Sequence, residues 1–90
     1  MGRQNGKRPP VAGAVTIQGL LVPDRWDAEG VITGVALLTG DEEKYLVQPD
    51  SGLESLLPLL RSRVELVGTV QLRQGEKIFF ARTPPLLLSG

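Results

Sequence analysis

The stretch SGLESLLPLLR, residues 51–61, is where the hydrophobic pattern of this 90-residue chain changes from alternation to a helical period. Ser51 and Glu54 have the spacing of a capping box, in which the hydroxyl and the carboxylate each satisfy a free backbone amide. The leucines that follow have the i, i+3, i+4, i+7 spacing of one apolar helix face: Leu53, Leu56, Leu57 and Leu60. Pro58 removes an amide donor inside this pattern, so we expect a short helix that is kinked or split into two turns.

The residues on both sides of this stretch predict β-strands, because apolar and polar side chains alternate there. Three strands are expected before it and two after it, over residues 14–22, 31–39, 44–48, 64–72 and 77–83. Pro23 is expected to end the regular pairing of the first strand or to place it at a sheet edge, and Pro49 is expected to end the third strand. Asp27 and Gly30 occupy the first and fourth positions of an expected type I turn between the first two strands. Glycines near the middle of the first, second and fourth strands predict bends, at Gly19, Gly34 and Gly68.

The order of three strands, one helix and two strands, with these central glycines, resembles the OB-fold over residues 14–83. The resemblance implies a mainly β protein: a five-stranded Greek-key barrel with one short helix between strands three and four, whose leucine face closes the open end of the barrel. A small SH3-like barrel is the rival topology, but it usually lacks a helical insert at this point. No diagnostic motif accompanies the match of topology.

The chain divides into a flexible basic N-terminal arm, residues 1–13, and a single stand-alone domain, residues 14–90, with an apolar C-terminal tail. Arg3, Lys7 and Arg8 give the arm a charge of +3, and because the formal net charge is zero the rest of the chain carries −3. A mildly acidic body does not attract polyanions over its whole surface.

The composition argues against several kinds of chemistry. The chain has no histidine and no cysteine, so disulfides and the usual ligands of zinc and haem are absent. Without these residues, a general base at neutral pH requires a strongly shifted carboxylate, lysine or tyrosine in a deep pocket. We therefore expect no enzyme, no cofactor and no metal. Asp41, Glu42 and Glu43 lack the spacing of a calcium loop and predict a solvated turn.

No apolar run reaches the length of a membrane span, so we expect no membrane partner. The absence of cysteine is compatible with a reducing cytoplasm, which is the expected location.

The OB resemblance also implies a ligand face on strands two and three, where this family binds oligonucleotides or oligosaccharides. Carried onto this chain, it predicts that Trp26 and Tyr45 stack on bases while Arg25, Arg73 and Lys77 contact phosphates. The alternative is that both aromatic residues serve only in packing. Acidic residues crowd the same loops and would repel phosphate: Asp24, Asp27, Asp41, Glu42, Glu43 and Glu76.

An apolar strip, Leu86, Leu87 and Leu88, follows Pro84 and Pro85 at the end of the chain. It can pack across its own domain, which we favour, extend the fifth strand, or dock on another protein or a second copy. Together these features predict a non-catalytic binding or protein-interaction module. Weak binding of single-stranded nucleic acid through the face of strands two and three is the alternative.

Overall fold

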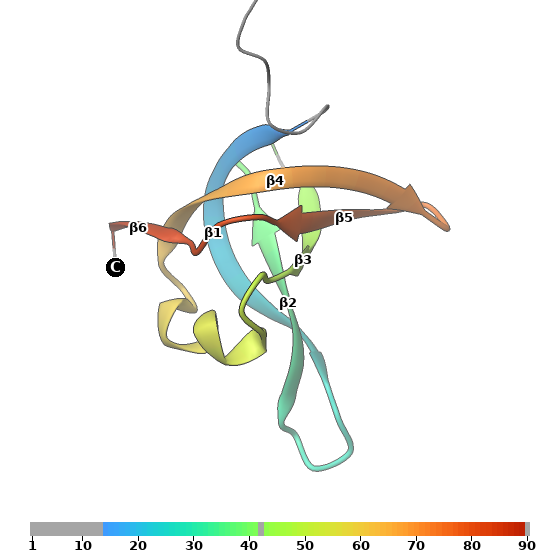
Figure 1. Ribbon diagram of the computed structural model, residues 1–90. Helices are drawn as coiled ribbons and strands as arrows, with labels where there is room; N and C mark the ends of the chain where they lie inside the picture. Colours follow the sequence, from blue (N-terminus) through green and yellow to red (C-terminus); the bar gives the residue numbers. More distant parts are fainter. Residues whose placement is uncertain (1–13, 42, 90) are drawn as a thin grey trace, which may run out of the picture.

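The computed structural model describes residues 14–41 and 43–89, which form six strands and two single-turn 3-10 segments (Figure 1). The strands are β1 (Val15–Trp26), β2 (Ile32–Leu38), β3 (Lys44–Gln48), β4 (Arg63–Arg73), β5 (Glu76–Ala81) and β6 (Leu86–Ser89). The 3-10 segments η1 (Leu53–Ser55) and η2 (Leu57–Leu59) lie between β3 and β4.

The predicted mainly β class is confirmed. The predicted arm, residues 1–13, lies outside the described residues. In the described part of the chain, no helix is long and apolar enough to cross a membrane.

Five of the strands form a ring. Neighbours pair in the order β1-β2-β3-β5-β4, and β1 also pairs with β4. These contacts are antiparallel except for the one between β3 and β5, which is parallel. β6 lies outside the ring and pairs antiparallel with the first residues of β4 (Figure 1). The ring encloses the core, whose fully or almost fully buried apolar residues are Leu21, Val35, Leu37, Val47, Leu56, Val64, Leu66 and Phe79.

The segment between β3 and β4 covers one end of this core. The backbone hydrogen bonds within the segment join residues three apart, and Pro58 has no amide with which to continue them, so the segment is split into η1 and η2 as expected. Leu56, between the two turns, is fully buried, and Leu53 and Leu60 pack against the core. The predicted apolar face is wrong at Leu57, which is exposed.

The predicted capping box is also wrong. Gly52, with φ 95°, precedes η1, and no side chain caps the segment. The Ser51 hydroxyl instead donates to the Asp50 carboxylate at 3.0 Å. The helical turns start one residue later than the capping box requires, because Gly52 holds a backbone conformation that brings the chain into η1 from a different direction.

The regular pairing of β1 ends at Pro23, as predicted, but the strand is longer than expected. β1 continues to Trp26, and Pro23 pairs with Val35 of β2. The register then slips on either side of Arg25, which lies opposite Gly34. The strand therefore accepts a proline where its ladder is irregular, and the bend predicted at Gly34 coincides with that irregularity.

β1 and β4 change partners at the other two glycines. Gly19 lies where β1 passes from β4 to β2, and a Cβ there would overlap the carbonyl oxygen of Leu38. Gly68 pairs with both β1 and β5. A Cβ on Gly68 would lie 2.8 Å from the carbonyl carbon of Phe80 and 2.9 Å from the Phe79 ring. The missing side chains let a neighbouring strand approach closely, which explains why glycine occupies both positions.

Substitution of Gly68 by alanine tests this constraint. The added Cβ meets backbone, which cannot rotate away, so Gly68→Ala should lower the free energy of unfolding by about 3 kcal/mol. Gly40→Ala is the matched control, because nothing lies within 4 Å of a Cβ at Gly40. Urea unfolding measures both variants. Equal midpoints for the two would mean that the ring does not require a glycine at position 68.

Candidate functional site

A groove of about 480 Å³ lies on the outer side of β2, β3 and β5. Because side chains alternate along a strand, Leu46 and Ile78 point away from the ring core, and they pair across the β3–β5 contact to form part of the groove floor. The β1–β2 hairpin, residues 23–34, contributes Asp24 and Arg25 to one wall, and Glu76 of β5 lies on the other. The groove is thus apolar at its base with charged groups of both signs on its walls.

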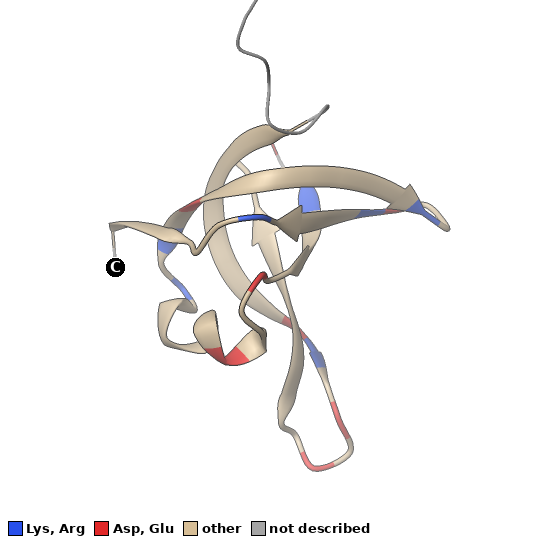
Figure 2. Ribbon diagram, in the orientation of Figure 1, with Lys and Arg blue, Asp and Glu red and all other residues tan. Residues whose placement is uncertain are grey.

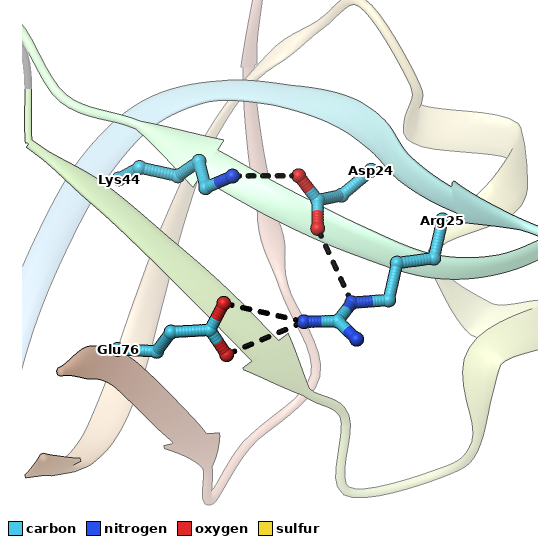
Figure 3. Close-up of polar contacts among 4 residues, drawn as sticks. All are labelled: Asp24, Arg25, Lys44 and Glu76. Atoms are coloured by element: carbon cyan, nitrogen blue, oxygen red, sulfur yellow. Dashed lines mark hydrogen bonds and ion pairs between the residues drawn. The ribbon is translucent and has the colours of Figure 1, made fainter. Parts of the chain in front are cut away.

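Three ion pairs connect the charged side chains here, and one of them, Arg25–Glu76, joins the two walls (Figure 3). Asp24, whose side chain is only 16% exposed, accepts from Lys44 Nζ at 2.9 Å and lies 3.5 Å from Arg25 Nε. Arg25 Nη2 reaches across to both carboxylate oxygens of Glu76, at 3.3 and 3.4 Å. The guanidinium of Arg25 therefore lies between two carboxylates and carries no unneutralised charge toward the groove.

Lys77 and Tyr45 lie on the opposite, core-facing side of the sheet. Tyr45 packs edge-on against the buried ring of Phe79, with 6.3 Å between the ring centroids. Lys77 forms an ion pair with Glu43, and its Nζ lies 5.5 Å from the centre of the Tyr45 ring. Tyr45 does not line the groove, because its neighbour Leu46 takes the outward position at that point of β3.

The remaining two predicted ligand residues are also outside the groove lining. The guanidinium of Arg73 donates to the side-chain oxygen of Gln71 at 2.9 and 3.1 Å and lies 5.5 Å from the centre of the Phe80 ring. Trp26 is 56% exposed at the far end of β1, near the tip of the β1–β2 hairpin. Of the five residues predicted to contact a ligand, only Arg25 therefore lines the groove.

The charges of the described residues are mixed along the strands and do not gather into a basic stripe (Figure 2). Sequence reasoning identified Asp24 and Glu76 as acids near the predicted ligand face, but it missed that they pair directly with Arg25. It also missed Leu46 and Ile78, although strict alternation from the core residues Val47 and Phe79 was a signal that could have identified both.

β6 forms a second candidate surface. Leu86 and Leu87 pair with Glu65 and Val64 of β4, so the tail neither extends β5 nor packs across the ring. The favoured prediction, that the leucines are buried on their own domain, differs from the structure: Leu86, Leu87 and Leu88 are 57%, 52% and 41% exposed. The backbone is held in place while the apolar side chains remain in solvent.

The described residues contain no group of three or more aspartate and glutamate side chains arranged to hold a metal ion. Asp41 instead stabilises its own turn: its carboxylate accepts from the Thr39 hydroxyl and from the Glu43 amide. Glu42 lies outside the described residues.

The ion pairs predict how the groove responds to loss of its acids. Asp24→Asn/Glu76→Gln removes both carboxylates that pair with Arg25 and the one that pairs with Lys44. Binding of an oligodeoxythymidylate at low ionic strength should therefore tighten by about tenfold through the added phosphate attraction. Quenching of Trp26 fluorescence measures the affinity. Glu29→Gln/Glu65→Gln, which changes the net charge equally at residues outside the groove lining, is the control. An equal gain in this control would contradict a role for the ion pairs.

The chain matches no protein-family model, and no curated protein or solved structure is significantly similar to it. The groove and β6 are therefore the two surfaces from which a function can be inferred.

Proposed function

We propose that this chain is an OB-type domain that acts as a non-catalytic protein-interaction module, with β6 as its contact surface. The observation that carries the proposal is the exposure of three consecutive leucines on a strand that is already paired with the domain.

Support for the OB assignment comes from the connectivity of the ring. The order β1-β2-β3-β5-β4, the closing pair between β1 and β4, and the parallel contact between β3 and β5 are the arrangement that a five-stranded Greek-key barrel of this family requires. The position of η1 and η2 between β3 and β4 also agrees with the family, where a helix covers the barrel end at this point. Fold alone does not define function, so the interaction role is argued from β6.

β6 has the properties of a strand suited to protein contact. Proteins usually protect an exposed sheet edge with charges, prolines or bulges, whereas Leu86–Ser89 contains no charge and no proline. Among the described residues, β6 pairs only with β4, which leaves its other edge open to a partner strand. Burying one exposed leucine contributes about 1.5–3 kcal/mol, so three leucines supply a useful part of a binding energy. Because β4 already holds the strand extended, a partner does not have to order it.

Single-stranded nucleic acid remains the second candidate ligand, and the exposed indole of Trp26, which follows the groove residue Arg25 in the chain, is the observation that favours it. The neighbouring charges favour the protein role instead. Arg25, Lys44 and Lys77 each form an ion pair with a carboxylate, so a phosphate would have to displace Asp24, Glu43 or Glu76.

The triple variant Leu86→Ser/Leu87→Ser/Leu88→Ser tests the proposal. We expect it to keep the circular dichroism and melting temperature of the parent chain while losing concentration-dependent self-association, measured by sedimentation velocity, and losing the proteins retained by the immobilised parent. Val31→Ser, which removes an equally exposed apolar side chain from the β1–β2 hairpin, should change neither readout. If the triple variant retains every association, β6 is not the contact surface. If it unfolds, the leucines belong to the stability of the domain.

A further inference from the structure

A second unpaired sheet edge lies at the opposite end of β4 from β6. β1 pairs with β4 from Leu20 opposite Arg63 to Val15 opposite Gly68, and β4 then continues to Arg73. Within residues 14–41 and 43–89, only β5 pairs with β4 beyond Gly68, and it does so on the other side. Figure 1 shows β4 and β5 extending together past the start of β1. The edge from residue 69 to residue 73 is thus open on the side where β1 would continue.

This edge carries the most exposed large apolar side chain of the described residues. Leu72 is 71% exposed and Val70 is 40% exposed, and both lie on the same face of β4 as the buried Val64 and Leu66. The core-facing side of β4 therefore continues beyond the ring without a cover. An open edge next to exposed apolar side chains is the usual place where another strand adds.

The register between β1 and β4 identifies the segment that fits this edge. Continuing the pairing backward from Val15 places Ala14 opposite Thr69, Gly13 opposite Val70, Ala12 opposite Gln71 and Val11 opposite Leu72. Alternation then puts Val11 on the same face as Leu72. Gly13 has no side chain, so Val70 opposite it has room between Val11 and Val15. Pro10 falls opposite Arg73, the last residue of β4, where a residue without an amide suitably ends the ladder.

We propose that the open edge of β4, residues 69–73, is the docking surface for residues 11–14 of the same chain, which extend β1 in register and cover Leu72 with Val11. This role is independent of β6, which pairs with residues 63–65 of β4. The basic arm then comprises residues 1–10, and Arg3, Lys7 and Arg8 all lie before the docked segment.

Covalent connection and charge both favour this occupant over a second copy of the chain. Residue 14 joins directly to the existing ladder at Val15, so docking needs no loop closure and no loss of translational freedom. Four residues at about 3.3 Å each span the same length as residues 69–72, the part of the edge with which they would pair. Neither residues 11–14 nor residues 69–72 contain a charged side chain, so no ion has to be desolvated when they meet.

The absence of native cysteine allows a direct test by disulfide trapping in the full chain. In Val11→Cys/Leu72→Cys the two thiols would face each other across a strand pair, at a spacing that a disulfide can bridge. In a glutathione redox buffer, we expect the effective concentration of the two thiols to exceed that of the control Ala12→Cys/Leu72→Cys by about tenfold or more. The control keeps the tether length but places the first thiol on the opposite face.

Equal values for the two cysteine pairs would overturn the proposal, because tethered collision without a fixed register predicts them. Disulfide-linked dimers that increase with protein concentration would also overturn it and would assign the edge to a second copy. Hydrogen exchange gives an independent measurement without cysteine. Gly13 lies opposite Val70, and the amides of Val70 and Leu72 are the ones that face the open edge, because the amides of the residues between them face β5. Gly13→Pro should reduce the protection of these two amides by about tenfold or more through loss of pairing, whereas Gln4→Pro should leave them unchanged. Unchanged protection in Gly13→Pro would overturn the proposal.

Discussion

The ladder between β1 and β4 closes the ring, and the other features of the structure depend on it. Each of these strands is longer than any single contact it makes, so each passes from one partner to the next along its length. Gly19 and Gly68 make these transitions sterically feasible, because the carbonyl groups of Leu38 and Phe80 occupy the space that a side chain would need. The same region of β1 also anchors the cover of the core: the Leu21 carbonyl accepts from Arg61 and its amide donates to the carbonyl of Ser62.

The groove follows from this closure. Once the ring is closed, the second half of β1 with β2 and the second half of β4 with β5 extend beyond it, and the groove is lined by the first extension, by β3 and by Glu76 and Ile78 of β5. Each extension carries charges of both signs, and Arg25 of one meets Glu76 of the other. Such half-exposed pairs contribute little to stability, on the order of 0–1 kcal/mol each. Their larger effect is to cancel the positive charge that a nucleic-acid groove requires.

Both candidate docking surfaces arise because β4 has more length than its partners cover. At its beginning, β6 adds to the side opposite β1 and leaves three leucines in solvent. At its end, β5 covers one side and the other remains open beside Leu72. The two surfaces differ in character, because the first presents side chains on a strand that is already paired, whereas the second presents unpaired backbone.

The sequence by itself determined the elements whose signals are local. Alternation identified the five ring strands, and both predicted ends of β3 agree with the structure. Asp27 and Gly30 identified the β1–β2 turn, where the Gly30 amide donates to the Asp27 carbonyl at 3.0 Å. The loss of an amide at Pro58 indicated the split between η1 and η2. Each of these signals acts between residues only a few positions apart.

Tertiary structure decided the features that require distant segments to meet. Pro23 was predicted to end regular pairing, but only the structure shows that β1 continues beyond it in an irregular ladder with β2. Arg25 and Lys77 looked like free cations because their carboxylates, Glu76 and Glu43, are more than thirty residues away in the chain. The exposure of Leu86–Leu88 could likewise not be predicted from the sequence. The hydrophobic effect favours burial of any leucine, and only the course of β4 determines that this strand lies outside the ring, where no apolar surface covers it.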